Sequence, residues 1–347
     1  MVSNMPGRRL VTTADISLDI TPVSPDEIWS DDDGRHQLNQ APLDRDLTRV
    51  FDRLAERLSD QTVVTYAPWI RSYWQVVDTR KMDLADLPLV RGWITALMTG
   101  QHAIKPTSLR VAIAALNAVF SLLKKPLPSD DAGTRAWLRG VYRSKAQPLK
   151  QASPILAEDL IDLVNQARAR KDLRGTRDAA IMLLGWHCAL RRSEICGLMI
   201  GDMTQAKRSQ EFLVLIRNSK TDQVKEGQTI PLYRSKDRRL DAISAIEAWV
   251  SEAGIRKGPL FRSLGKSGDV SSDPLNARSI NFILKQYVMP KAGISAHSLR
   301  SGFVTEGGLQ GVPLLNIMVT TRHKSIETAR RYLRLIDPIH QGSGPLI

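Results

Sequence analysis

Cysteine and long apolar runs are nearly absent from this 347-residue sequence. The two cysteines, Cys188 and Cys196, are too few for a disulfide framework, so we expect a reducing, cytoplasmic setting. No apolar run approaches the roughly 18 residues that a membrane-spanning helix requires. The first residues, MVSNMPGRRL, also lack the apolar stretch of a secretory signal. We therefore expect a protein that neither crosses a membrane nor is secreted.

The common nucleotide-binding and metal-binding motifs are missing as well. The sequence contains no P-loop, no GxGxxG after a strand and no HExxH. His187, Cys188 and Cys196 are too few and too badly spaced for a structural zinc site, and burial explains them better. There is no obvious carboxylate cluster for two-metal nuclease chemistry. If the protein acts on a phosphodiester, we expect it to do so without a metal.

Positive charge is what the sequence has in excess. It contains 49 Lys and Arg against 36 Asp and Glu, which gives a formal net charge of +13. Such a surface releases counterions when it meets a polyanion, and nucleic acid is the commonest one. The charge alone also fits an ordinary basic protein, so it favours a DNA or RNA partner without proving one.

The hydrophobic pattern divides the chain into a tail and two domains. Residues 1–43 mix Pro, Ser, Asp and Gly without periodicity, which predicts a flexible tail. Residues 44–143 show helical spacing of apolar side chains and predict a helical domain. Residues 144–154 are basic and interrupted by proline, as in a linker. The second domain then runs over 155–347 with a short C-terminal tail.

The second domain predicts a mixed fold. It opens with amphipathic helices over 157–168 and 176–187, followed by a period-two strand at 212–216. A polar turn leads to a second strand at 229–232, and helical segments follow. The fold class that we predict is mainly α with a small β-hairpin or sheet (α+β).

Two basic segments of this domain are suited to phosphate chemistry. In HCALRRSEICGL, Arg191 and Glu194 share a face if 190–198 is helical, and the carboxylate would preorganise the guanidinium to grip a phosphate. In IRNSKTDQVKEGQTIPL, Lys220 lies in the hairpin connection and could donate a proton to a leaving oxygen. A surface ion pair and a solvated turn lysine explain the same residues equally well.

A third segment adds two histidines, an arginine and a tyrosine. His297 and Arg300 are three residues apart, so on a helix both can face one oxyanion. His323 precedes another helix, and Tyr332 follows nine residues later with three arginines within two positions of it. A phenol with an ordinary pKa of about 10 attacks phosphorus readily only in a strongly positive site. Taken singly, each of these residues also has a purely structural explanation.

In their order and spacing these motifs resemble the catalytic domain of the tyrosine recombinases, also called the phage integrase family. The motifs are LRRSE at Arg191, SKTDQ at Lys220, HSLR at His297 and Arg300, and RHKSIETARRYLR at His323 and Tyr332. The resemblance covers the second domain closely, whereas the first domain resembles the family's core-binding domain only in pattern and position. Ala189 and Arg322 stand where the family often has glycine, and Ser301 stands where many relatives have histidine.

The resemblance implies a site-specific recombinase that cuts and rejoins DNA without a metal, ATP or any other cofactor. Tyr332 would attack the scissile phosphate, leaving a 3′-phosphotyrosyl bond and a free 5′-hydroxyl. The implied roles of the other residues are phosphate binding and charge stabilisation by Arg191 and Arg300, protonation of the 5′-oxygen by Lys220, assistance to the tyrosine proton by His297, a hydrogen bond to the phosphate from His323, and support of Arg191 or His297 by Glu194.

The resemblance also implies partners and an assembly. The two domains would close as a clamp around duplex DNA at recombination sites, with a dimer on each site and a tetramer in synapsis. We expect the protein in the cytoplasm, associated with the nucleoid when bound to DNA. Candidate DNA contacts are the basic residues Lys105, Arg110, Arg139, Arg143 and Lys145.

Two alternatives stay open. A type IB topoisomerase-like enzyme would relax DNA with related chemistry but without paired sites. A non-catalytic, sequence-specific DNA-binding protein would share the charge and the fold and would tolerate Tyr332→Phe. Integration, resolution and excision also remain open, although the tail shows no clear arm-binding domain and so favours a simple recombinase over a lambda-like integrase.

Overall fold

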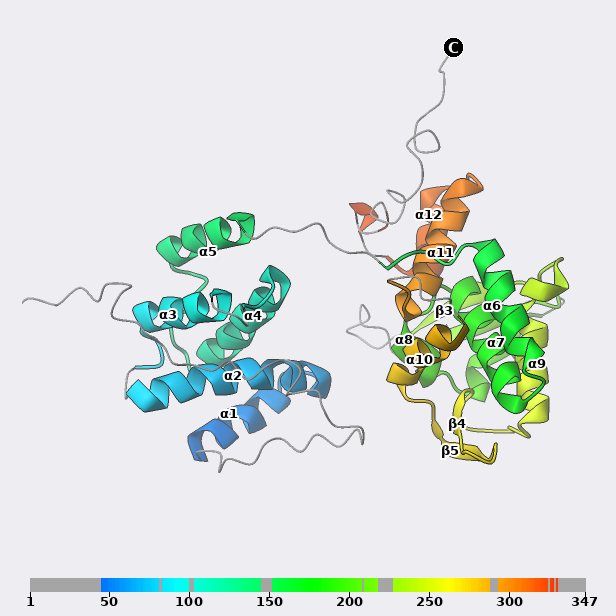
Figure 1. Cartoon of the computed structure of the whole chain (residues 1–347), viewed down its shortest axis with the longest axis horizontal. Helices are drawn as coiled ribbons and strands as arrows, with labels where there is room; N and C mark the ends of the chain where they lie inside the picture. The colour runs from blue at the N-terminus through cyan, green and yellow to red at the C-terminus, as the bar shows by residue number, and fades with distance from the viewer. Residues whose placement is uncertain are drawn as a thin grey trace, which may run out of the picture. The chain divides into compact units, whose positions relative to one another are not determined.

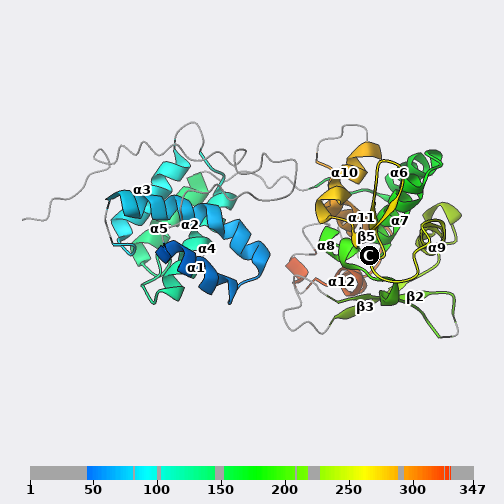
Figure 2. The same ribbon diagram turned by 90° about the horizontal axis from the view of Figure 1, so that it is seen from below.

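The computed structural model describes residues 45–80, 83–99, 103–144, 152–207, 209–217, 227–287, 293–323, 325–327 and 329. The chain forms two compact units, Met1–Pro148 and Leu149–Ile347, which appear in Figures 1 and 2 and are described one at a time. The division falls inside the segment 144–154 that we predict as a linker, while the predicted domain limits themselves stay a prediction. The mainly helical fold with small antiparallel sheets confirms the predicted fold class.

The described part of the first unit is entirely helical. Its helices are α1 (Arg45–Ala55), α2 (Asp60–Arg80), α3 (Leu87–Met98), α4 (Pro106–Leu122) and α5 (Ala132–Ser144). Leu47, Val50 and Leu54 of α1 are all buried, as their helical spacing predicts. This apolar stripe packs on α2 and α4.

Aromatic side chains form the centre of the first unit. The rings of Tyr73 and Trp93 meet edge to face with their centroids 5.3 Å apart. Each polar group has a partner: Tyr73 Oη donates to the Leu84 carbonyl (2.7 Å) and Trp93 Nε1 donates to Ser72 Oγ (3.1 Å). Buried tyrosine and tryptophan normally need such partners, so these bonds fix how α2 and α3 pack.

The second unit holds helices around two small sheets. Its helices are α6 (Ala157–Ala169), α7 (Leu173–His187), α8 (Arg192–Gly197), α9 (Ala242–Glu252), α10 (Ala277–Tyr287), α11 (Ala296–Leu309) and α12 (Leu314–Thr321), with 3₁₀ turns η2 (Ile200–Asp202) and η3 (Arg238–Leu240). The strands are β1 (Met203–Gln205), β2 (Phe212–Ile216), β3 (Gln228–Leu232), β4 (Arg262–Leu264) and β5 (Val270–Pro274). None of the helices that the structure describes has the length and apolarity to span a membrane.

The β2–β3 hairpin matches the sequence prediction closely. The sheet is antiparallel with the order β1-β2-β3, and Val214 pairs with Ile230. Both of these side chains are buried while their neighbours along the strands are more exposed, which is the alternation that the period-two pattern predicts. Strands β1, β4 and β5 are not among the sequence predictions.

Helix α7 is the centre of the second unit. It packs against α6, α9 and α11, and every side chain from Ala179 to Leu184 is buried; Figure 1 shows α6 and α9 on its two sides. At Gly302 of α11, an added Cβ would lie 1.9 Å from the Ile155 carbonyl oxygen. The absence of a side chain there lets α11 approach residue 155 closely, and Ile155 N donates to the Ser298 carbonyl (3.1 Å). This contact sets the position of the helix that carries His297 and Arg300.

Candidate active site

Arg191 and Glu194 form a pair at the start of α8, but not in the way we predict. The helix begins at Arg192, so Arg191 is its N-cap with extended backbone (φ −78°, ψ 153°) and not a residue within a helix over 190–198. The Glu194 carboxylate accepts from both Arg191 N (2.8 Å) and Arg191 Nη1 (2.7 Å). A carboxylate at the third helical position commonly satisfies the N-cap amide, and here the same group also orients the guanidinium.

Arg300 connects three segments from the interior of the unit. Only 1% of its surface is exposed. Its Nη1 donates to the carbonyl of Ala189 in the α7–α8 turn (2.7 Å), and its Nη2 donates to the carbonyl of Thr321 at the end of α12. A buried guanidinium is tolerated only when it is well hydrogen-bonded, so these carbonyls fix the side chain of Arg300.

Ala189 and Arg322, which stand where the tyrosine recombinases often have glycine, both have a left-handed backbone conformation. Ala189 has φ 47° and Arg322 has φ 59°, a region that costs residues with a Cβ roughly 1–2 kcal/mol. Glycine adopts this conformation without that penalty. Both positions therefore favour glycine on backbone grounds, and Ala189 and Arg322 adopt this conformation at a cost in stability.

Arg322 joins Arg191, Glu194 and Arg300 in one arginine cluster. Its side chain is buried, with Nη2 donating to Glu194 Oε2 (2.6 Å) and Nη1 to the carbonyls of Thr320 (3.1 Å) and Cys188 (3.4 Å). Burial raises the pKa of Glu194, but Arg322, Arg191 and the Arg191 backbone N–H more than offset this and hold that pKa below its ordinary value. Glu194 is therefore a carboxylate shared between two arginines.

His297 and His323 both lie close to the two catalytic arginine candidates. His297 is exposed in the first turn of α11, which Ser295 caps, and His323 Nδ1 lies 3.0 Å from Thr321 Oγ1. Partial burial, then Arg300 and Arg191, lower the pKa of His297 and lower that of His323 to about 3. Both imidazoles are consequently neutral at neutral pH, and each can donate through one nitrogen and accept through the other.

The structure thus brings five of the predicted catalytic residues together, from segments more than 100 residues apart. These are Arg191, Glu194, His297, Arg300 and His323. Lys220 and Tyr332 lie outside the described residues. The sequence prediction missed Arg322; the available signal was a charged residue at a typical glycine position directly before His323.

Paired guanidinium groups beside neutral imidazoles suit a phosphate better than a metal ion. Guanidinium groups bind phosphate oxygens through fixed, charge-assisted hydrogen bonds. Within the ranges that the structure describes, no three His, Cys, Asp or Glu residues group as they would around a metal ion.

The cysteines and their neighbouring histidine have structural surroundings. Burial raises the pKa of the Cys188 and Cys196 thiols to about 12, and a His187 ring nitrogen lies 2.8 Å from the Leu240 carbonyl oxygen. The burial that we predict for the two thiols is observed.

The candidate DNA contacts of the first unit are all exposed where they are described. Lys105 is the N-cap of α4 and makes no capping hydrogen bond with its side chain. The Arg110 guanidinium lies over the Tyr142 ring, 5.0 Å from the centroid, so it links α4 to α5. Arg139 and Arg143 lie on α5, whereas Lys145 falls outside the described residues.

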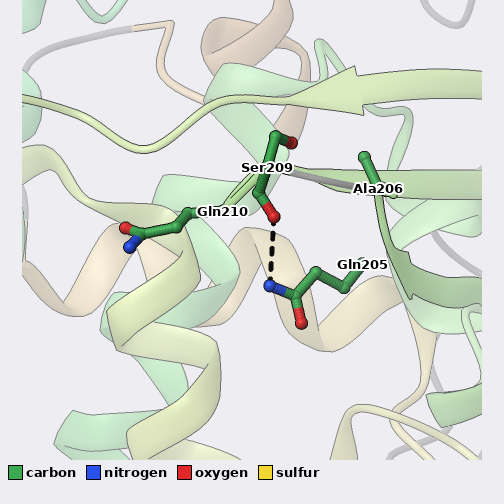
Figure 3. Close-up of a pocket in the computed structure, with 4 residues that line it drawn as sticks. All are labelled: Gln205, Ala206, Ser209 and Gln210. Carbon is green, nitrogen blue, oxygen red and sulfur yellow. Dashed lines mark hydrogen bonds between the residues drawn. The ribbon is translucent and has the colours of Figure 1, made fainter.

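A pocket lies elsewhere in the second unit, at the β1–β2 connection. Gln205, Ala206, Ser209 and Gln210 line it, and the Gln205 amide donates to the Ser209 carbonyl (3.1 Å; Figure 3). None of these residues belongs to the arginine cluster, and the pocket offers no charged side chain to a ligand.

Comparison with known proteins identifies the family. The model of the phage integrase family matches residues 155–337, more than half of the chain. The chain belongs to the phage integrase family. Tyrosine recombinases of this family are DNA strand-transfer enzymes, and the match covers every segment that contributes to the arginine cluster.

Curated relatives agree with membership of the phage integrase family. The integrase/recombinase XerD homolog of Selenomonas ruminantium is 32% identical over 210 residues, which are 59% of this chain and 61% of that protein. The tyrosine recombinase XerC of Mycobacterium sp. (strain JLS) is 26% identical over 283 residues, covering 79% of this chain and 88% of that protein.

Solved structures of a lambda integrase and of the XerH recombinase share the fold. A lambda integrase dimer bound to a COC′ core site is 15% identical, with a TM-score of 0.56 over 82% of this chain and 76% of that one. The XerH recombinase in a post-cleavage complex with palindromic difH substrate is also 15% identical, with a TM-score of 0.56 over 80% and 77% of the two chains. At this identity the likeness concerns the fold alone.

Proposed function

We propose that this protein is a site-specific DNA recombinase that cleaves and rejoins duplex DNA through a 3′-phosphotyrosyl bond to Tyr332. The observation that carries the proposal is the convergence of Arg191 and Arg300 beside two neutral histidines. Membership of the phage integrase family supports the same reaction.

The two arginines would stabilise the transition state. When a phenolate attacks phosphorus, negative charge grows on the non-bridging oxygens of the five-coordinate phosphorus. Donors that are already in place act on this charge without reorganisation, and each such donor is commonly worth about 10²–10³ in rate. Glu194 orients Arg191, and the Ala189 and Thr321 carbonyls orient Arg300, so both are preorganised for this role.

The histidines and the lysine would handle protons. A neutral His297 can accept the proton of the attacking tyrosine, and a neutral His323 can donate to a phosphate oxygen. Lys220 is our candidate for the acid that protonates the leaving 5′-oxygen. The energy of the broken phosphodiester is retained in the phosphotyrosine, so a 5′-hydroxyl from a partner strand can reverse the step without ATP or a metal.

The organisation of the chain follows from this proposal. Residues 44–143 would be a core-binding domain that contacts DNA through its exposed basic residues, and residues 155–347 would be the catalytic domain. A dimer on each site and a tetramer in synapsis would exchange the strands. A lambda integrase tetramer bound to a Holliday junction has a fold similar to this chain, with a TM-score of 0.56 at 14% identity, which is compatible with such an assembly.

A trapping experiment tests the proposal. Purified protein would be incubated with nicked suicide duplexes from its own genomic neighbourhood in the presence of a chelator, and a DNA-linked band sought on a denaturing gel. We expect an adduct with the wild type and none with Tyr332→Phe. The exposed Tyr233 provides the matched control, and Tyr233→Phe should retain the adduct.

Other outcomes would identify the alternatives. An adduct that survives Tyr332→Phe would move the nucleophile elsewhere, and an adduct lost in chelator would contradict the metal-free mechanism. Relaxation of supercoiled DNA regardless of site would favour a topoisomerase-like enzyme. Specific binding without cleavage would favour a non-catalytic DNA-binding protein.

A further inference from the structure

Arg322 lowers the stability of the fold at the position it occupies. It ends α12 in the left-handed conformation (φ 59°, ψ 37°), where glycine would be free of strain. Its guanidinium is almost fully removed from solvent, and its Nε has no hydrogen-bond partner among the described residues. Desolvation and an unsatisfied donor both act against folding, so stability alone does not account for an arginine here.

The contacts of Arg322 lead directly to the phosphate-binding candidates. Its Nη2 donates to Glu194 Oε2 at 2.6 Å, while the other oxygen of that carboxylate, Oε1, accepts from Arg191 Nη1 at 2.7 Å. Its Nη1 reaches the Thr320 and Cys188 carbonyls. Arg322 thereby ties the end of α12 to the α7–α8 turn, and it shares Oε2 of Glu194 with the Arg191 backbone N–H (2.8 Å).

This arrangement has a consequence for charge. A carboxylate paired with one arginine alone cancels much of the positive potential that the arginine can offer to a phosphate. When a second buried arginine shares the same carboxylate, the three groups carry a net charge of +1, and the first arginine keeps more of its potential for an anion. The low pKa of Glu194 keeps the carboxylate ionised, so the shared pair persists at neutral pH.

We propose that Arg322 is a positioning residue for strand cleavage, which holds Glu194 and shares its negative charge so that Glu194 orients Arg191 without neutralising it. This inference rests on the proposed recombinase function. Arg322 touches neither the phosphate nor the nucleophile in this scheme and acts through Glu194.

The test compares single-turnover cleavage by variants of the full chain on the same suicide duplex. Arg322→Met keeps a long side chain without charge, and we expect a fall of about 10–100-fold in cleavage rate, the size typical for groups that orient a functional ligand. DNA affinity should change little. Arg322→Gly relieves the backbone strain. Its cleavage rate should still fall by a similar factor, because the glycine lacks the guanidinium that holds Glu194.

A conservative variant and a matched control separate positioning from folding. Arg322→Lys retains a cation for Glu194 but lacks the planar fork, so it should recover part of the rate. Arg177 is also buried and paired with a carboxylate, Asp178 at 2.8 Å, outside the cluster. Arg177→Met should therefore lower the thermal midpoint while leaving the cleavage rate of the folded protein unchanged.

The decisive readout is a double-mutant cycle with Glu194→Gln. If Arg322 acts through Glu194, the double variant should cleave about as slowly as the slower single variant, whereas independent losses would multiply. Multiplying losses, or a wild-type rate in folded Arg322→Met, would overturn the inference. Should Arg322→Met fail to fold, the cycle would use Arg322→Gly, which also lacks the charge, and a wild-type rate in that variant would likewise overturn the inference.

The behaviour of the wild type distinguishes a failure of the proposed recombinase function from a failure of the positioning role of Arg322. Wild-type protein that binds the duplex but forms no adduct would refute the proposed function and this inference with it. Wild-type cleavage together with unaltered cleavage by the Arg322 variants would refute only the positioning role.

Discussion

The two units differ in how deeply their candidate functional cations are buried. In the first unit Lys105, Arg110, Arg139 and Arg143 are all exposed. In the second unit Arg300 is buried at the centre of the candidate site and held by main-chain carbonyls. An exposed cation keeps its charge in water wherever it lies along a helix, whereas a buried one needs fixed partners.

The family model covers only the unit with the buried cations. The family match runs over 155–337 and lies in the second unit. Two hydrogen-bond partners of Arg300 come from positions 189 and 321, so backbone shifts in either segment would disturb Arg300. The family model does not extend into the first unit, whereas the alignment over 79% of this chain with XerC of Mycobacterium sp. (strain JLS) does, at 26% identity.

The largest effect on cleavage is expected from a substitution of Arg300, a buried cation of the second unit. Arg300→Lys replaces a planar fork by a single ammonium, which cannot bond two carbonyls and a phosphate in the same geometry. We expect single-turnover cleavage to fall by about 10²–10³-fold, as for loss of a transition-state donor. The matched exposed change, Arg139→Lys, should stay close to the wild-type rate. A loss of less than tenfold for Arg300→Lys would contradict the assigned role.

Two glycines test how tightly each unit is packed. At Gly302 a new Cβ would meet the Ile155 carbonyl oxygen at 1.9 Å, whereas at Gly140 of α5 it would meet nothing within 4 Å. Gly302→Ala should cost about 1–3 kcal/mol or more through overpacking, while Gly140→Ala should stabilise α5 by about 1 kcal/mol. Calorimetry of the full-length variants would measure both, and a neutral Gly302→Ala would contradict the close approach.

Between pH 6.5 and pH 4, we expect the second unit to account for the loss of folding stability as the pH falls. The pKa of His323 is lowered to about 3 by burial and by Arg300 and Arg191, so the unfolded chain takes up a proton at this position first as pH falls. The stability that this group confers is therefore complete above about pH 6.5 and is lost progressively towards pH 3.

The first unit supplies the comparison for this prediction, because its described residues contain no histidine. Its carboxylates with lowered pKa, Asp83 and Asp131, affect stability only below about pH 4. Unfolding free energies measured from pH 4 to 7 should show a shallower slope for His323→Asn than for the wild type. Equal slopes would contradict the neutral imidazole.

The smallest effect is expected for single exposed cations of the first unit. Arg110→Ala should weaken DNA binding modestly and reduce the slope of log affinity against log salt by about 1, as expected for one phosphate contact. The cleavage rate at saturating DNA should not change. Filter binding over a salt series would measure the slope, and an unchanged slope would remove Arg110 from the DNA contacts.

The local spacing of apolar residues was sufficient to predict most of the fold. Helix α6 and strand β2 occur where their periodicity places them, because apolar spacing records which face is buried. Strands β1, β4 and β5 span only three to five residues and have largely exposed or half-buried side chains, so no strong pattern marks them.

The site was predictable only as far as its residues act in recognisable motifs. Five of the proposed catalytic residues cluster, while Lys220 and Tyr332 stay predictions from sequence. The N-cap position of Arg191 was missed because helix limits depend on backbone geometry at Ala189. The partnership of Arg322 with Glu194 was missed because it joins residues 128 positions apart.

The burial of both native cysteines makes it practical to label the protein with fluorophores at introduced cysteines. A thiol reacts as its thiolate, and with pKa values of about 12 neither Cys188 nor Cys196 forms one appreciably at neutral pH. The native chain therefore offers no competing target to a maleimide dye. A cysteine at exposed Ser144 in the first unit and another at exposed Ser251 in the second would take a donor and an acceptor fluorophore. Energy transfer between them would report in real time whether the distance between the two labels changes when DNA is added.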